Sequence, residues 1–372
     1  MLRIGMIGCG FMGRTHAYAV ANLPFFYKDL PFTARVCGVC ASEPSHAKEA
    51  ARRYGLGEAA ENEEELIGSP DIDIIDICTP NICHYDTILR ALAAGKHVYC
   101  EKPLCVSEAQ AFHAAREAKR TGLTAGIVFN NRFLLPVMRA KEIVEEGRLG
   151  RILSFRGAYY HSSAADPNRP AGWKQDRTVC GGGVLYDLGS HVLDLIYYLC
   201  GPFASVYGVG NIAYPTRIGR DGKPWNTNAE EAFYLTARLA CGAVGTVETG
   251  KIFQGTNDDL SFEIYGTDGA LRFSLMDPNF FEYYDAAAPH AGFTRVECCN
   301  RYPAPGGVFP GAKAPAGWLR GHVGSMYAFL DAVYRGVPAS PSFADGAHIQ
   351  AVMEAAYRSA ESGRMEEVHA LV

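Results

Sequence analysis

The feature that most constrains this chain is a glycine-rich turn between a short apolar run and a helix-like segment. Residues 2–7 are mostly apolar, Gly8-Cys9-Gly10-Phe11-Met12-Gly13 follows directly, and residues 14–22 continue as a helix. In a strand–turn–helix unit, Gly8 allows the tight turn, Gly10 lets the backbone approach a pyrophosphate, and Gly13 lets helix and strand pack closely. The diphosphate then lies on the N–H groups at the helix start. We predict a dinucleotide site formed by Gly8, Gly10, Phe11 and Met12.

Apolar strand-like runs alternate with helical segments through the first third of the chain. The runs are 34–40, 71–78, 97–100 and 123–129, with helices expected at 47–54 and 86–94. Repeated β-α-β units predict a parallel, doubly wound Rossmann sheet, here over residues 1–129. After the second strand, where NAD-selective folds place an acid, the chain has Ser42 and then Glu43. The sequence therefore favours NAD slightly, with NADP left open.

Polar residues follow two later strands, at the edge where a doubly wound sheet binds its ligand. Thr79-Pro80-Asn81, with His84 shortly after, follows one strand, and Glu101-Lys102-Pro103 follows the other. We expect Thr79, Pro80, Asn81, His84, Glu101 and Lys102 to line the cofactor site. A locally bonded histidine at a helix start is an equal alternative for His84. Because Pro103 biases Lys102 away from helical geometry, its ammonium should stay at the strand end, facing the reacting oxygen of a substrate.

The sequence pattern changes near residue 152, where apolar and polar residues alternate and so indicate half-exposed strands. Strands are expected at 152–160, 233–239, 243–249, 260–265 and 270–273, and Gly266-Thr267-Asp268-Gly269 is a hairpin signal. Residues 298–317 are rich in Pro and Gly and predict a long loop, and 322–334 and 345–362 predict closing helices. Residues 130–372 therefore predict an α+β domain with a large, open, mainly antiparallel sheet.

A second chemical motif begins with Gly181-Gly182-Gly183 and continues into a helix that carries Asp187 and His191. Residues four apart share a helix face, so the carboxylate can orient the imidazole. Histidine is the residue type with an ordinary pKa near neutrality, which suits a general base. A satisfied core histidine is the alternative. Two zinc ligands could share this spacing, but no third ligand is apparent, so we expect no metal.

Four further residues are predicted to contact the substrate. Arg132 follows the last strand of the first domain, Tyr160 ends the strand at 152–160, and Trp173 and Lys174 lie in the polar loop beyond it. Long polar loops beside a crevice usually carry specificity. Trp173 offers a flat apolar face that can stack on a sugar ring, although anchoring its own loop is equally consistent with the sequence.

Composition narrows the compartment and the partners. The 372 residues are 48% hydrophobic and 20% charged, with net charge −5, and no apolar run approaches the roughly 20 residues that span a bilayer. We therefore expect no nucleic acid or membrane partner. Twelve cysteines without a secretion signal predict reduced thiols and a cytoplasmic protein.

These motifs, in this order, resemble the Gfo/Idh/MocA family of nicotinamide-dependent oxidoreductases. The resemblance rests on Gly8-x-Gly10-x-x-Gly13-x-x-His16, Thr79-Pro80-Asn81-x-x-His84, Glu101-Lys102-Pro103, Asn131-Arg132-Phe133 and the Gly181-to-His191 stretch. It implies hydride transfer between the cofactor and a secondary hydroxyl of a sugar, glycoside or cyclitol. His191 would be the base, oriented by Asp187, and Lys102 would stabilise the developing oxyanion.

Two further expectations accompany this assignment. The alternative function is a redox-neutral conversion of a glycoside, in which a transient ring oxidation with retained NAD is followed by elimination or re-reduction. The open sheet of the second domain is a natural surface for subunit pairing, so we expect a homodimer or homotetramer.

Overall fold

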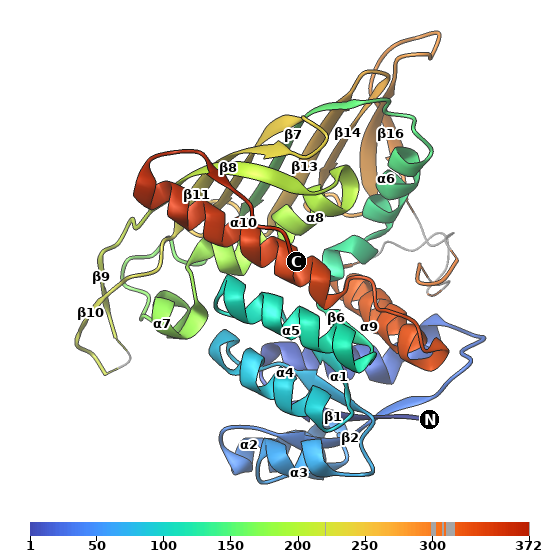
Figure 1. Ribbon diagram of the computed structural model, residues 1–372, viewed down its shortest axis with the longest axis vertical. Coiled ribbons are helices and arrows are strands. Elements are labelled where there is room, and N and C mark those ends of the chain that lie inside the picture. Colours follow the sequence, from blue (N-terminus) through green and yellow to red (C-terminus); the bar gives the residue numbers. More distant parts are fainter. Residues whose placement is uncertain (220, 299–302, 307–308, 310–316, 372) are drawn as a thin grey trace. The chain divides into compact units, whose positions relative to one another are not determined.

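The structure is a computed structural model that describes the chain except residues 220, 299–302, 307–308, 310–316 and 372 (Figure 1). It contains two compact units. Unit 1 comprises Met1–Cys105, Ala109–Leu134 and Cys299–Ala347, and unit 2 comprises Val106–Glu108, Leu135–Cys298 and His348–Val372. The later segment in unit 1 was assigned by the sequence to the second domain, so the boundary at residue 129 stays a prediction. Most of the loop expected at 298–317 lies outside the described residues.

Unit 1 is built on a six-stranded parallel sheet with the order β3-β2-β1-β4-β5-β6. This is the strand order of a Rossmann fold, which confirms the predicted fold class. The order in which successive strands are added to the sheet reverses between β1 and β4, so the loops after these two strands flank the ligand-binding crevice. The strands are β1 (Leu2–Ile7), β2 (Ala34–Cys40), β3 (Glu58–Ala59), β4 (Ile74–Ile77), β5 (His97–Cys100) and β6 (Ala125–Ile127).

The helices of unit 1 follow the alternation seen in the sequence. α4 is strongly amphipathic, with Ile88, Ala91 and Leu92 on its buried side. The helices are α1 (Phe11–Phe26), α2 (Pro44–Tyr54), α3 (Glu63–Gly68), α4 (His84–Ala93), α5 (Glu108–Thr121), most of which belongs to this unit, and α9 (Trp318–Arg335).

Helix α9 joins unit 1 from far along the chain. Its apolar residues Val323, Met326 and Leu330 are part of the buried core that also contains Ile4 and Val20 of β1 and α1. The helix packs on α1, and the rings of Tyr27 and Tyr327 stack at 4.0 Å. Because this packing joins residues about 300 positions apart, local patterns in the sequence carry no signal for it.

Unit 2 is built on a nine-stranded sheet with the order β16-β15-β14-β13-β7-β12-β11-β8-β17. The pair β7–β12 is parallel and all other neighbours are antiparallel, which confirms the mainly antiparallel sheet. The strands are β7 (Ile152–Tyr160), β8 (Phe203–Asn211), β11 (Ala232–Leu239), β12 (Val244–Gly250), β13 (Asp259–Gly266), β14 (Gly269–Ser274), β15 (Phe280–Asp285), β16 (Thr294–Glu297) and β17 (Glu366–Glu367). A separate two-stranded ribbon is formed by β9 (Thr216–Ile218) and β10 (Pro224–Asn226).

One face of this sheet is covered by helices. α8 (Ser190–Cys200) packs on β7 and β13, and α6 (Leu135–Glu145) packs on α8 and β14 (Figure 1). Gly157 of β7 permits the close approach, since a Cβ there would lie 2.6 Å from the side chain of Val192. The short α7 (Arg177–Cys180) lies before α8, and α10 (Phe343–Ser362) follows α9.

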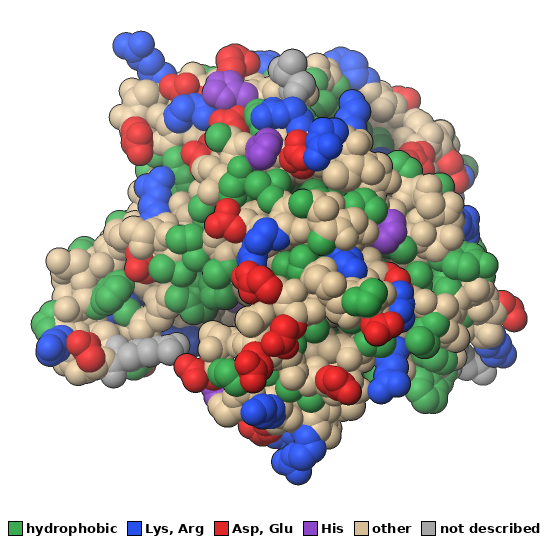
Figure 2. All heavy atoms as spheres, turned by 60° about the horizontal axis from the view of Figure 1, so that its bottom comes forward, with side chains coloured by type: hydrophobic (Ala, Val, Ile, Leu, Met, Phe, Trp, Pro, Cys, Tyr) green, Lys and Arg blue, Asp and Glu red, His purple; other side chains and the backbone are tan. Residues whose placement is uncertain are grey.

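The surface carries charges of both signs, as the composition suggests. Figure 2 shows one face on which acidic and basic side chains are interspersed. Among the described residues, no helix combines the length and the apolar character that crossing a membrane requires.

Candidate active site

The glycine turn has the geometry that the sequence predicts. Gly8 has φ +97°, and a Cβ on it would lie 2.6 Å from the carbonyl oxygen of Cys78 in the loop after β4. A Cβ on Gly13 would lie 2.2 Å from the Gly8 carbonyl oxygen, so the start of α1 rests directly on the turn. At Gly10 nothing lies within 4 Å of the Cβ position, which leaves room for a group to approach this backbone. The turn therefore fits a diphosphate at the N-terminus of α1.

The first residues of α1 meet the start of α9. Phe11 is 63% exposed, and its ring stacks on that of Trp318 at 5.9 Å. Met12 follows Phe11 in the first turn of the helix. On the other side of the turn, Ser42 and Glu43 are exposed after β2. Glu43 takes the N-cap position of α2, so a carboxylate is present at the end of this strand.

His84 links the two strand-end loops. One ring nitrogen lies 2.9 Å from the Pro103 carbonyl oxygen and the other lies 3.0 Å from that of Thr79. The ring is fully buried, and burial lowers the pKa of His84, so the neutral ring donates to one of the two oxygens. These contacts match the local-bonding alternative for His84. Asn81, which opens the 3₁₀ turn Asn81–Cys83, is 8% exposed.

Glu101 and Lys102 are connected to a buried histidine that sequence reasoning did not place in the site. His16 of α1 donates from Nδ1 to Asp76 Oδ1 (2.8 Å) and from Nε2 to Glu101 Oε1 (3.1 Å). The other oxygen of Glu101 accepts the backbone N–H of Lys102 at 3.1 Å. His16 thus orients Glu101, and Glu101 holds the backbone of Lys102.

The charges of this network follow from its geometry. Burial alone would lower the pKa of His16, but its contacts with Asp76 and Cys78 together outweigh burial and raise that pKa well above its usual range. Burial likewise opposes ionisation of Glu101, but the hydrogen bond and charge of His16 lower the pKa of Glu101 to about 2. The group is therefore a buried imidazolium between two carboxylates.

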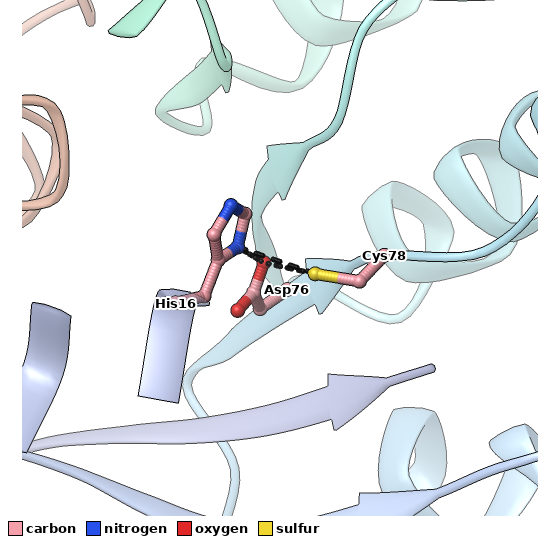
Figure 3. A group of neighbouring side chains, drawn as sticks. All are labelled: His16, Asp76 and Cys78. Atoms are coloured by element: carbon pink, nitrogen blue, oxygen red, sulfur yellow. Dashed lines mark hydrogen bonds and ion pairs between the residues drawn. The ribbon is translucent and has the colours of Figure 1, made fainter. Parts of the chain in front are cut away.

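His16, Asp76 and Cys78 point toward one another (Figure 3). One possible ligand atom from each lies within 4.8 Å of the other two. These three side chains could hold a metal ion if His16 and Cys78 were deprotonated. Here both nitrogens of His16 carry hydrogens directed at carboxylates, and burial raises the pKa of the Cys78 thiol. Both groups would have to lose a proton before they could bind a cation. We interpret the cluster as a hydrogen-bonded support for Lys102.

Replacing His16 by asparagine should lower the free energy of unfolding by about 3 kcal/mol, because it leaves two buried carboxylates without their cation. The folded-state pKa of His16 is raised, so its contribution is fully present below the ordinary histidine pKa of about 6.5 and decreases as pH rises above it. The contribution of Glu101, whose pKa is lowered, is present above about pH 4.5 and is lost toward pH 2. Urea denaturation should therefore show a larger difference between wild type and variant at pH 6 than at pH 9.

The matched control is His46→Asn, since His46 is an exposed histidine of the same unit. This variant should unfold like the wild type at both pH values. A His16→Asn deficit that does not change between pH 6 and pH 9 would show that the imidazole is not charged in the folded state.

In unit 2, Asp187 lies in a π-helical turn, Leu185–Gly189, that leads into α8. His191 lies in the first turn of α8. The backbone N–H of Ser190 donates to the Leu185 carbonyl oxygen, one residue further back than in an α-helix. Such π turns recur at functional sites because they redirect side chains. Sequence periodicity predicted a regular helix here and missed the wider turn.

Glu230 fixes the start of this helix. It accepts the backbone N–H groups of Gly183 (3.1 Å) and Leu185 (3.0 Å), and the Tyr357 hydroxyl donates to it at 2.8 Å. A Cβ on Gly183 would lie 2.2 Å from the Glu230 carbonyl oxygen, so glycine is required at this contact. Burial raises the pKa of Glu230. The glycine run therefore serves to bring the backbone against this carboxylate.

Asp187 is surrounded by ammonium groups. Lys174 donates to both of its oxygens (2.8 and 3.0 Å), and Lys251 Nζ lies 2.7 Å from Oδ2. Lys174 was predicted to contact the substrate, and Lys251 was not singled out by the sequence.

The His191 ring lies 6.0 Å from that of Tyr159 on β7. The hydroxyl of Tyr159 donates to Asp258 at 2.8 Å, and His161 approaches the same carboxylate oxygen at 2.7 Å. Hydrogen bonds from His161 and Tyr159 outweigh burial and lower the pKa of Asp258. These three residues were not included in the predicted catalytic set.

Tyr160, a predicted substrate contact, lies on the face of β7 opposite to its neighbour Tyr159, and its contact with the substrate stays a prediction. Tyr159 faces α8 and His191, whereas Tyr160 points to the opposite side of the sheet, where its hydroxyl donates to Glu248 at 2.6 Å. It lines a cavity of about 800 Å³ on that side, together with Arg156 and Arg272. Successive side chains of a strand point to opposite faces, which is why these two neighbouring tyrosines have different surroundings.

Two other predicted substrate contacts have definite surroundings. Arg132 is 4% exposed and lies 3.4 Å from Asp345, which gives it a structural partner within unit 1. Trp173 is 38% exposed in the 3₁₀ turn Trp173–Gln175, with the Lys174 ammonium 5.6 Å from its ring centroid. The exposed face of Trp173 leaves both of its interpretations open.

Comparison with known proteins agrees with the fold and the motifs. Residues 2–129 match the family model described as "Oxidoreductase family, NAD-binding Rossmann fold", and residues 137–272 match the GFO/IDH/MocA C-terminal domain. Levoglucosan dehydrogenase of Pseudarthrobacter phenanthrenivorans is 34% identical over 96% of each chain. D-glucoside 3-dehydrogenase of Escherichia coli is 30% identical over 67% of this chain and 70% of that protein.

The solved structures extend this likeness to the whole molecule. A complex of levoglucosan dehydrogenase with NADH and L-sorbose has a TM-score of 0.97 at 33% identity and covers all of both chains. The chain belongs to the Gfo/Idh/MocA family of NAD-binding oxidoreductases.

Proposed function

We propose that this protein is an NAD-dependent dehydrogenase that oxidises a secondary ring hydroxyl of a sugar or glycoside, with levoglucosan as the first substrate to test. The likeness to levoglucosan dehydrogenase over the whole chain carries this proposal. The matched length spans the segments that carry the dinucleotide turn and Asp187. The likeness to a D-glucoside 3-dehydrogenase supports oxidation of a ring hydroxyl.

The residues present fit a bound dinucleotide. The open Cβ position of Gly10 and the N–H groups at the start of α1 would hold the diphosphate. Glu43, exposed at the end of β2, would favour the ribose hydroxyls of NAD over the phosphate of NADP. When bound, NAD supplies the acceptor for the hydride.

The protein itself has to stabilise the negative charge on the substrate oxygen and accept the hydroxyl proton. Oxidation of an alcohol removes a hydride from carbon and a proton from oxygen, so negative charge builds on the oxygen as the reaction proceeds. We assign Lys102 to stabilise that charge and His191 to take the proton. Asp187 would accept hydrogen bonds from a second hydroxyl of the substrate and so fix the ring orientation.

The test is absorbance at 340 nm with NAD and levoglucosan, methyl glucosides, glucose, myo-inositol and glucose 6-phosphate as separate substrates. One NADH formed per oxidised sugar is the expected result. Loss of the sugar without net NADH, followed by NMR, would instead establish the redox-neutral alternative. If no substrate of the panel reacts by either measurement, the proposed substrate class is wrong.

The cavity on the sheet face opposite α8 supports subunit pairing. It is lined by both charge signs, including Arg156, Glu248, Glu263 and Arg272, so the same surface of a second copy can meet it with opposite charges. We propose that homodimers or homotetramers form through this face. Light scattering on the purified protein measures the mass directly.

The cysteines of the described chain are free thiols. Reduced cysteines support the proposal that the protein works in a reducing compartment such as the cytoplasm.

A further inference from the structure

Two lysines approach the carboxylate of Asp187, and they differ in burial. The side chain of Lys251 is 8% exposed and that of Lys174 is 46% exposed. Lys251 holds Oδ2 at 2.7 Å, whereas Lys174 spans both oxygens at 2.8 and 3.0 Å. A buried ammonium needs a counter-charge, because it has given up its hydration. An exposed ammonium can exchange its partner for water at little cost.

The backbone around Lys251 is fixed as well. Lys251 directly follows β12, its N–H donates to the Glu231 carbonyl oxygen at 2.9 Å, and its own carbonyl oxygen accepts from Ala164 at 2.8 Å. Lys174 lies in a short 3₁₀ turn of the polar loop. One ammonium is therefore held by the sheet, and the other reaches Asp187 from an exposed loop.

We propose that Lys251 is a positioning residue for the reaction, which holds one oxygen of Asp187 in place while Lys174 yields the other oxygen to a substrate hydroxyl. This inference rests on the proposed function of Asp187 and makes it more specific. A carboxylate with one oxygen committed to Lys251 can bind a hydroxyl next to the one that is oxidised. The substrates that fit are rings with adjacent hydroxyl groups, a vicinal diol.

The experiment compares Lys251→Met, Lys251→Arg and Asp187→Asn in the full-length protein, with initial rates measured against NAD and the best substrate of the panel. Lys251→Met is expected to lower kcat by about tenfold or more and to raise KM, since Asp187 loses its fixed partner. Lys251→Arg keeps the charge and should recover a large part of kcat. Lys141→Met is the matched control, because Lys141 is a lysine of the same unit that pairs with Glu145 at 3.4 Å.

A double-mutant cycle separates positioning from a general effect on folding. In the Asp187→Asn background, Lys251→Met should change kcat by less than about twofold, because the group it orients is already gone. NADH binding, measured by fluorescence titration, should be the same in all variants. If Lys251→Met does not fold, Lys251→Gln replaces it, and the comparison with Lys251→Arg carries the same test.

The substrate series adds a second readout. For the wild type, removing the substrate hydroxyl next to the reacting one should raise KM strongly. For Lys251→Met, KM should differ little between the full substrate and the same deoxy substrate. Normal kcat and KM in Lys251→Met, beside a strong loss in Asp187→Asn, would overturn the proposal for Lys251. Normal turnover in Asp187→Asn would instead refute the role proposed for Asp187 itself.

Discussion

Replacing Lys102 by methionine is expected to lower kcat by about 10²–10³-fold, the cost of removing one group that stabilises a developing oxyanion. Methionine has a similar length but no charge, so the volume at the end of β5 is retained. The variant should still bind NADH in a fluorescence titration, because the glycine turn and α1 are unchanged. Stopped-flow or steady-state absorbance at 340 nm measures the loss.

Lys119→Met is the matched control for this prediction. Lys119 is an exposed lysine in the last turn of α5, and its loss should leave the rate unchanged. Turnover of Lys102→Met close to that of the wild type would remove Lys102 from the chemistry. Loss of NADH binding together with activity would show that Lys102 serves cofactor binding instead.

Replacing His191 by asparagine should lower kcat by about 10²–10⁴-fold, the usual contribution of a general base. Asparagine keeps a polar group of similar size in the first turn of α8 but cannot take up the proton. The rate of the wild type should fall on acidification as the base becomes protonated, and that part of the pH profile should be absent in the variant. Initial rates between pH 5 and pH 9 provide the measurement.

His290→Asn is the corresponding control, since His290 is an exposed histidine of the same unit. A His191→Asn variant that keeps the acid-side pH dependence of the wild type would assign the base to another group. His161, which contacts Asp258 at 2.7 Å, is then the next residue to test.

The residues that support Lys102 could be predicted from the sequence only in part. The glycine turn and the Glu101-Lys102-Pro103 strand end were recognisable because each is a local arrangement of a few residues. The contact between His16 and Glu101 joins positions 85 residues apart. Asp76 offered a signal, as a carboxylate in an otherwise apolar strand, but its partner depends on how α1 packs against the sheet.

The polar cluster around Asp187 in unit 2 could likewise be predicted only in part from the sequence. Spacing placed Asp187 and His191 on one helix, but the π turn between them and the Lys251 ammonium depend on packing against β12 and Glu230. The alternation along β7 separates its two faces but does not tell which face carries α8. Gly157 lets α8 approach the face of Tyr159.

The sequence by itself determined the elements that depend on neighbours along the chain: the glycine turn, the strand ends, the hairpin at 266–269 and the doubly wound order of unit 1. Backbone sterics and hydrophobic periodicity act over a few residues, so they are legible in the sequence. The tertiary structure alone decided the buried imidazolium beside Glu101, the lysines around Asp187 and the face of β7 that meets His191. The first two arrangements depend on the cost of burying charge, which is set by partners that only folding brings together. The third depends on the close approach of α8 that Gly157 permits.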